Sequence, residues 1–218
     1  MNNALVQLLV LAAVAIFLIL RLRNVLGTRD GYEPPKAPQA PGPRPVADIV
    51  DIQPNQNDTD ITDHAEPGSA TAEALAAMKR AEPSFEVGPF LSGAKSAYEM
   101  ILMAFEHGDV SEMRPFLSPE VASAFEGVIA DRKEQGLTTQ AEYLGTRETS
   151  LAGASFNQAT GLAEISVRFV GELLMSVRNA EGEVVEGDPK KSQKQRDTWT
   201  FARQMGQDDP NWRLVATA

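Results

Sequence analysis

Apolar residues are concentrated at the start of the chain, in a run from Ala4 to Leu20 that only Gln7 interrupts. A helix of this length rises about 26 Å, and apolar residues just beyond it extend the helix toward the roughly 30 Å of a hydrocarbon core. Arg21, Arg23 and Arg29 follow the run directly. The pattern predicts one membrane-crossing helix, with residues 4–20 in the lipid bilayer.

Two alternatives are a cleaved signal peptide and a helix that lies in the membrane interface. A signal peptide needs basic residues before its apolar run and a small-residue cleavage site after it, and this sequence shows neither. We therefore predict an uncleaved transmembrane anchor over residues 1–27. Because Lys and Arg accumulate on the cytoplasmic flank of a short-tailed span, the arginines predict a single-pass protein, N-out, with its C-terminal domain in the cytoplasm.

An acidic, proline-rich stretch follows over residues 28–68. Between Asp30 and Pro67, eight acidic residues and two basic ones give a net charge of −6, more than half of the −10 of the whole chain. Prolines are dense there and aromatic residues are nearly absent, so the segment cannot bury enough apolar surface to offset the entropy of ordering it. We predict a disordered, extended linker.

Helical spacing begins after residue 68. Thr71–Arg80 has the composition of a short, alanine-rich helix. From Phe90 to Phe105, apolar residues recur at intervals of three and four, which predicts a long core helix. Gly108 follows at a position where a helix commonly ends.

Two further helix starts are visible. The tetrapeptide at 109–112, Asp-Val-Ser-Glu, has the form of a capping box, in which two side chains satisfy each other's free backbone amides. Ser118 and Pro119 are typical of an N-cap and a first helical position, and Gly136 ends the helical spacing that follows them. We therefore predict three or four helices before the first strand.

Beyond residue 138 the period of the pattern changes to two. It is plainest from Ala163 to Arg178, where odd positions are apolar and even positions are mostly polar, as in a half-buried antiparallel strand. Gly171 interrupts this strand and predicts a bulge or bend there. Further strands are expected at 141–151, 195–205 and 212–217. The order of helices followed by a curved sheet predicts an α+β fold.

Composition limits the chemistry that the chain can perform. The sequence contains no cysteine, which excludes disulfides, thiolate nucleophiles and cysteine zinc sites. Without paired histidines or carboxylates at ligand spacing, we predict no metal site and no cofactor. The net charge of −10 suits phosphate backbones poorly, so nucleic acid is not an expected partner. Outside the anchor, the length allows one globular unit, over residues 69–218.

Several stretches of this unit resemble the bacterial Tim44-like family, a branch of the nuclear transport factor 2-like (NTF2-like) superfamily. The stretches are FLSGAKSAYEMI at 90–101, AFEHGD at 104–109, DTWTFAR at 197–203 and DPNWRLVAT at 209–217, and EVVEGDP at 183–189 is similar to the family's β-hairpin. The anchor and residues 26–29 also look like those of bacterial members. The resemblance implies an NTF2-like cone, in which helices pack against a strongly curved antiparallel sheet.

The same resemblance implies a scaffold at a membrane. The mitochondrial relative recruits the Hsp70 import motor to the inner-membrane translocase, and a ribosomal relative helps to hold ribosomes at a membrane. We therefore expect an adaptor, not an enzyme, that recruits a protein partner to the cytoplasmic face of the inner membrane. The partner would be a chaperone, a translocase or an assembly factor, in protein translocation or membrane-protein assembly. The alternative is a module that binds a lipid or a hydrophobic peptide.

Two sets of residues are candidates for binding. The first set would line a pocket inside the cone for an acyl chain or an apolar peptide, although aromatic residues are most often plain core; it comprises Phe90, Ala94, Tyr98, Phe105, Phe125, Phe169, Trp199, Phe201 and Trp212. The second set is basic and comprises Lys190, Lys191, Lys194 and Arg196. The default interpretation is mutual neutralisation with the acidic Glu183, Glu186 and Asp188 of the same hairpin, and the alternative is contact with anionic lipid headgroups.

Few residues are candidates for catalysis. His107 precedes a helix end, where an imidazole complements the helix dipole, and His64 falls in the predicted linker. Asp197 enters the third strand and would act as a general base only if it pointed inward. A salt bridge from Asp197 to a lysine at the hairpin end is the favoured interpretation.

Overall fold

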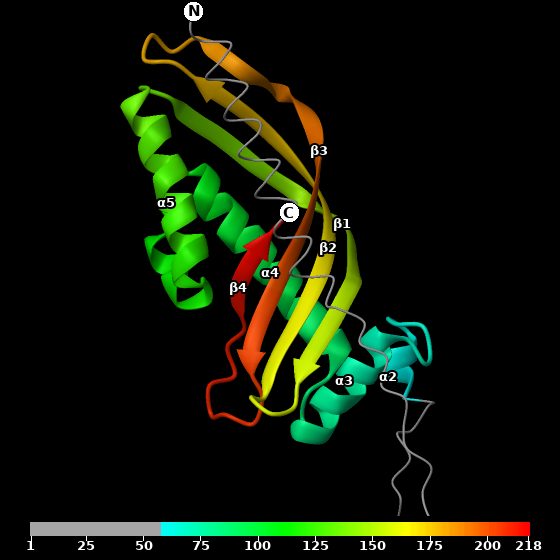
Figure 1. Ribbon diagram of the computed structural model, residues 1–218. Coiled ribbons are helices and arrows are strands. Elements are labelled where there is room, and N and C mark those ends of the chain that lie inside the picture. The colour runs from blue at the N-terminus through cyan, green and yellow to red at the C-terminus, as the bar shows by residue number, and fades with distance from the viewer. Residues whose placement is uncertain (1–57) are drawn as a thin grey trace, which may run out of the picture. The chain divides into compact units, whose positions relative to one another are not determined.

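Helices precede a four-stranded sheet in residues 58–218, the part of the chain that the computed structural model describes (Figure 1). The helices are α2 (Thr59–Thr62), α3 (Ala70–Ala81), α4 (Val87–Glu106), the 3-10 helix η1 (Ser111–Phe116) and α5 (Pro119–Glu134). The strands are β1 (Thr138–Asn157), β2 (Leu162–Arg178), β3 (Val184–Gln204) and β4 (Arg213–Thr217). This order confirms the predicted α+β class.

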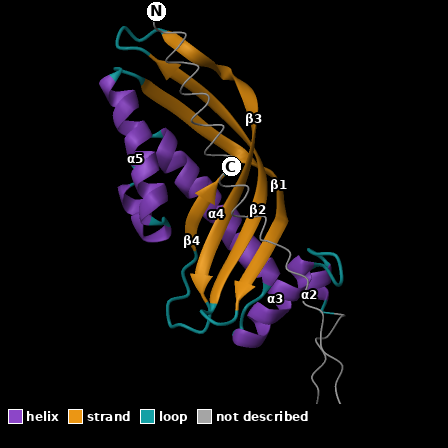
Figure 2. Ribbon diagram, in the orientation of Figure 1, coloured by secondary structure: helices purple, strands orange, loops and turns teal. Residues whose placement is uncertain are grey.

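The sheet is antiparallel throughout and has the order β1-β2-β3-β4. Figure 2 shows α4 and α5 on the concave side of the bent sheet. The apolar residues of β2 face this side, and Ile165, Val167 and Phe169 are fully buried. The alternation read from the sequence therefore identifies the buried face of the central strand correctly.

Serine hydroxyls cap two of the helices. The Ser118 hydroxyl accepts a hydrogen bond from the Val121 amide at 3.2 Å at the start of α5, as predicted. The Ser69 hydroxyl accepts one from the Ala72 amide at 3.2 Å at the start of α3, where no cap was predicted from the sequence. Only the aspartate half of the predicted capping box forms. The Asp109 carboxylate accepts from the Ser111 amide at 2.9 Å, and the segment continues as a 3-10 helix instead of an α-helix.

The folded unit extends into the range that the sequence assigned to the linker. Helix α2 lies within residues 28–68, and its Ile61 is buried in the core. The Asp60 carboxylate accepts hydrogen bonds from the amides of Val87 and Gly88 at 2.8 and 3.0 Å. These contacts tie α2 to the start of α4, so a boundary at residue 69 is wrong.

Of the bulge or bend predicted at Gly171, the bulge is wrong for this strand, because the nearby register shifts lie on the neighbouring strand β1. The register of β1 against β2 shifts at Leu144 and at Arg147, on either side of the partner of Gly171. A Cβ at Gly171 would lie 3.3 Å from the ring of Tyr143 and 3.4 Å from the hydroxyl of Tyr98. The glycine therefore gives two tyrosines room to approach the strand.

The hairpin between β2 and β3 turns earlier than predicted. Its turn is closed by hydrogen bonds between Asn179 and Glu183, so the acidic stretch at 183–189 belongs to strand β3 and is not the turn. Farther along β3, the register jumps between Asp188 and Ser192. The three residues between them, 189–191, form a bulge.

The predicted anchor, residues 1–27, and the predicted linker up to residue 57 lie outside the described residues. Within residues 58–218, no helix has the combination of length and apolar character that a bilayer crossing requires.

Candidate functional site

Three of the nine predicted pocket residues fill the core beneath the sheet. The ring of Tyr98 stacks on Phe169 with centroids 4.3 Å apart and an interplanar angle of 11°, and Trp199 meets Tyr98 edge-on at 4.7 Å. All three side chains are buried. They pack on one another, as close-packed core residues do.

The hydroxyl of Tyr98 has a charged partner. It donates a hydrogen bond of 2.5 Å to the Asp197 carboxylate. This carboxylate also accepts one from the side-chain amide, Nε2, of Gln195 at 3.4 Å. Burial, together with the neighbouring carboxylate, raises the pKa of Tyr98 far above its ordinary value. Asp197 thus points inward, and its partner is a tyrosine; the lysine salt bridge favoured from the sequence does not form among residues 58–218.

Phe105 and Phe125 form a separate pair between α4 and α5, with ring centroids 4.8 Å apart. The guanidinium of Arg132 lies 4.7 Å from the centroid of Phe105 and pairs with the Glu106 carboxylate at 3.2 Å. Burial raises the pKa of Glu106, and Arg132 opposes the shift. This pair holds the two helices together.

The remaining four predicted residues, Phe90, Ala94, Phe201 and Trp212, lie in an apolar groove of about 300 Å³ along α4. We call it the α4 groove. It is lined by Pro89, Phe90, Gly93, Ala94, Ala97, Met100 and Ile101 of α4, Met113 and Phe116 of η1, Phe201 of β3, and Pro210, Asn211 and Trp212 before β4.

Small residues of α4 leave room for the groove, and large apolar residues form its rim. Gly93 and Ala97 stand one turn apart on α4, and no side chain fills the space above Gly93. Met100 and Phe116 are 51% and 37% exposed, so the rim presents apolar surface next to the apolar lining of the groove. Asn211 is the one polar side chain in the lining.

A buried ion pair supports the aromatic wall of the groove. Arg203 pairs with Glu82 at 2.5 Å and places its guanidinium 5.3 Å from the ring centroid of Trp212. The hydrogen bond from Arg203, against the effect of burial, holds the pKa of Glu82 below its usual value. Trp212 in turn contacts Phe90 with centroids 4.7 Å apart. The groove is therefore preformed on one side.

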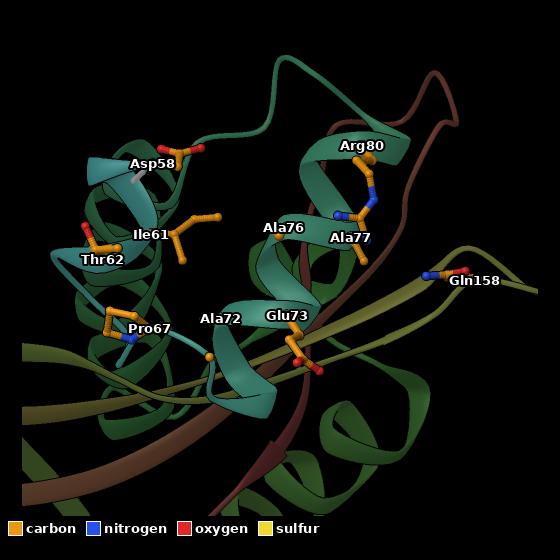
Figure 3. A pocket seen from close by; sticks show the side chains of 11 residues that line it. Asp58, Ile61, Thr62, Pro67, Ala72, Glu73, Ala76, Ala77, Arg80 and Gln158 are labelled. Atoms are coloured by element: carbon orange, nitrogen blue, oxygen red, sulfur yellow. The ribbon is translucent and has the colours of Figure 1, made fainter. Parts of the chain in front are cut away.

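A larger cleft of about 530 Å³ lies between α2 and α3 (Figure 3). Ile61 and Pro67 line one wall, alanines of α3 line the other, and Glu73 and Arg80 add charge. None of the nine predicted residues belongs to this cleft. Sequence reasoning missed it because residues 58–68 read as linker; the only available signal was the repeat of small residues at Ala72 and Ala76.

A family model of the Tim44-like domain matches residues 71–218. The chain belongs to the Tim44-like family. The mitochondrial import inner membrane translocase subunit TIM44 of Homo sapiens is 28% identical over 148 residues, and that of Mus musculus is 26% identical over 148 residues. Each alignment covers 66% of this chain and 32% of the relative, so the chain matches about a third of the length of these relatives.

Among solved structures, the intermembrane space region of the chloroplast protein ARC6 is similar at 13% identity with a TM-score of 0.39. The similarity covers 59% of this chain and 94% of that one. The Tim44-like domain assignment itself confirms the resemblance read from the sequence. The α4 groove lies wholly within the Tim44-like domain, whereas α2 precedes the matched range.

The four basic residues predicted to contact lipid headgroups form no ion pairs with the nearby acids of the hairpin. Lys190, Lys191, Lys194 and Arg196 are all exposed, and none takes part in an ion pair within residues 58–218. The Asp188 carboxylate accepts instead from the backbone amide of Lys190 at 2.9 Å. The mutual neutralisation that was the default interpretation of the sequence therefore does not take the form of direct ion pairs.

The histidines of the described chain stand apart from the groove. His107 is exposed at the C-cap of α4, and His64 is exposed in the turn after α2. Among residues 58–218, no three His, Asp or Glu side chains gather as a metal site would need.

Proposed function

We propose that the chain is a membrane-anchored adaptor that recruits a protein partner to the cytoplasmic face of the inner membrane, in protein translocation or membrane-protein assembly. The observation that carries the proposal is the exposed, preformed α4 groove on a Tim44-like domain. Relatives that share the domain are named as subunits of a mitochondrial inner-membrane translocase. No catalytic step is part of this proposal.

The tether belongs to the proposal as well. Residues 1–27 form the single-pass anchor, N-out, and the proline-rich residues 28–57 form the spacer that carries an NTF2-like cone near the inner leaflet. The support is the apolar run that arginines follow, together with the dense prolines of the spacer. External protease should leave the domain intact in whole cells and digest it after the membrane is opened; digestion in whole cells would refute the orientation.

The α4 groove suits the apolar side chains of a folded or helical partner segment. Its lining is almost wholly apolar, so burying it against another protein removes apolar surface from water without stranding a polar group. Met100 and Phe116 stand at the rim, where flexible and aromatic side chains adapt to a partner. The groove thus provides the buried centre that a protein interface needs.

Photocrosslinking in cells tests this function. A photoreactive amino acid at Met100 of the full-length chain should give a discrete protein adduct, and the same amino acid at Val128 should not. Val128 is the matched control because it is 43% exposed but lies on α5, outside the groove. Removal of residues 1–27 should abolish the Met100 adduct. Identical products at both positions would refute the adaptor function of the groove.

The alternative is a lipid or hydrophobic-peptide module, and the absence of charge in the α4 groove favours it as a second candidate. An acyl chain would occupy the groove, while Lys190, Lys191, Lys194 and Arg196 would contact anionic headgroups. Native mass spectrometry of the full-length chain released from nanodiscs should then show a retained lipid. Replacement of Ala97 with Phe, which fills the groove, should remove it. Retention of the same lipid by both proteins would reject the alternative.

A further inference from the structure

We propose that the free edge of strand β3, at residues 192–197, binds an acidic peptide segment of a partner protein as an added β-strand. This inference deepens the proposed adaptor function and rests on it, because it names a second surface and the chemistry of what docks there. The surface is separate from the α4 groove, which includes none of these residues.

Within residues 58–218, the edge is open because β4 pairs with only part of this side of β3. Paired residues run from Trp199 to Ala202, and one further pair of backbone hydrogen bonds joins Thr198 to Ala218. Beyond Thr198, no other described strand pairs with this side of β3. On its other side, β3 pairs with β2 in an unbroken register from Ser192 onward, so the edge strand is held in extended conformation.

The alternation of backbone groups shows which residues face the open edge. Thr198 directs both its N–H and its C=O toward Ala218, at 2.7 and 2.9 Å. In an antiparallel strand, every second residue directs both groups to the same side. Ser192, Lys194 and Arg196 therefore present three donors and three acceptors to the open edge, which is the template that strand addition uses.

The edge has defined ends. At one end, residues 189–191 leave the ladder as a bulge that contains Pro189. At the other end, Thr198 of β3 is paired with Ala218. The six residues between them span about 20 Å. A short extended peptide fits this length, whereas the bulge blocks longer pairing.

The charge of the edge selects the partner. The octapeptide at 189–196 carries four positive charges and no negative one, in a chain with a net charge of −10. Glu172, which lies opposite Lys194 on β2, is already held by Arg147 at 2.6 Å, and none of the four cations forms an ion pair within residues 58–218. Two copies of this edge would repel each other, whereas an acidic strand would be attracted.

The alternation of side chains between the two faces of β3 also specifies where acidic residues should lie in the peptide. Lys194 and Arg196 lie on the face opposite Asp197, which points to Tyr98 inside the cone. A bound strand would place acidic residues at alternate positions beside these two cations, on the convex face of the sheet. An anionic lipid headgroup would meet the same cations but not the backbone.

A matched pair of variants separates the contribution of the backbone hydrogen bond to peptide binding from the contribution of the positive charge. Lys194→Ala and Lys194→Pro both remove the cation, but only the proline removes the outward N–H, which takes no part in the β2 ladder. The probe is the blocked synthetic peptide Thr-Glu-Val-Glu-Val-Glu-Thr, titrated against the full-length chain in neutral detergent micelles. Amide hydrogen exchange of both variants, without peptide, checks that the β2–β3 pairing is intact.

The expected result is slowed exchange of the 192–197 amides in the presence of the peptide. Lys194→Ala should weaken binding about threefold, and Lys194→Pro should weaken it about fivefold more, as expected for one lost backbone hydrogen bond. The same peptide with lysine in place of glutamate should not bind. Equal weakening by the two variants, or peptide binding without protection of 192–197, would overturn the inference.

Two further measurements distinguish the possible failures. If vesicles containing phosphatidylglycerol bind the chain through Lys194 while the peptide does not, the edge serves a lipid and the inference fails. If the Met100 adduct persists in cells while the peptide does not bind, only the edge inference is refuted. Loss of the Met100 adduct with intact peptide binding would instead refute the adaptor function assigned to the groove.

Discussion

The carboxylate of Asp60 accepts a 2.8 Å hydrogen bond from the backbone amide of Val87, 27 residues farther along the chain. Val87 begins α4, and the N-cap residue of that helix, Glu86, makes no side-chain hydrogen bond to it. Asp60 therefore supplies the cap and the negative charge that a helix N-terminus favours. Because Lys79 also contacts Asp60 at 2.8 Å, one side chain joins α2, α3 and α4.

Loss of this carboxylate should destabilise the domain. We expect Asp60→Ala to lower the free energy of unfolding by about 2 kcal/mol, because two amides at the start of α4 and the Lys79 ammonium lose their partner. Urea unfolding followed by circular dichroism measures the change. Asp63→Ala, at an exposed position just after α2, is the control and should change stability by less than about 0.5 kcal/mol. Equal effects would contradict the capping role.

Stability should decline steeply at acidic pH. Although burial opposes the shift, hydrogen bonds from Lys79 and from the amides of Val87 and Gly88 lower the pKa of Asp60, and Arg203 lowers the pKa of Glu82. A lowered folded-state pKa contributes stability that is present above the unfolded-state value, about 4, and is lost as the pH falls through the folded-state value. The Tm measured between pH 7 and pH 3 should therefore drop mainly below about pH 4.

Glu106 should act in the opposite direction. Burial raises the pKa of Glu106 despite Arg132. Protonation of Glu106 therefore favours the folded state as the pH falls and does not contribute to the loss of stability.

The variants Asp60→Ala and Glu82→Gln should flatten the decline of Tm below pH 4 relative to the unaltered chain. A parallel decline in all three proteins would exclude Asp60 and Glu82 as its cause.

The hydrogen bond between Tyr98 and Asp197 should stabilise the core in a way that depends on both groups. Tyr98→Phe should cost about 1 to 2 kcal/mol of unfolding free energy, since it leaves a partly buried carboxylate without its donor. The same substitution in an Asp197→Ala background should cost less. A double-mutant cycle measures the coupling, and a coupling energy near zero would show that the contact contributes nothing to stability.

Two glycines of the β2–β3 hairpin should differ sharply in their tolerance of alanine. Gly187 has φ +75°, and a Cβ there would overlap the carbonyl of Met175. Gly182 has φ +84° but open space around it. We expect Gly182→Ala to cost about 1 kcal/mol from backbone strain alone. Gly187→Ala should cost clearly more or shift the bulge, and hydrogen exchange of the hairpin amides would report either outcome.

Local features of the fold were predictable because they depend on near neighbours in the sequence. The intervals of three and four from Phe90 to Phe105 and the alternation from Ala163 to Arg178 correspond to α4 and β2. Ser118 caps α5 as the sequence indicates. The Tim44-like resemblance depended on such local motifs, and the match over residues 71–218 confirms it.

The candidate site was predictable only in part. Nine residues were proposed for one pocket, but helix spacing cannot tell which aromatic rings meet each other and which remain at a surface. Tyr98, Phe169 and Trp199 pack together in the core, Phe105 pairs with Phe125, and the other four lie in the α4 groove. These nine residues separate into three groups because of how α4 crosses the sheet. The contacts of α4 with the sheet join residues about 100 positions apart in the chain, as between Tyr98 and Asp197.

From the sequence alone came the long helices and the strands in their order, the cap of α5 and the family, because periodicity and end residues act over a few positions. Tertiary structure decided three other matters: that Asp60 belongs to the fold, that Asp197 meets a tyrosine, and that the lysines of β3 stay unpaired beside an open edge. Each of these depends on groups distant in the chain and adjacent in space, and a carboxylate's role is set by whichever donors the packing brings to it.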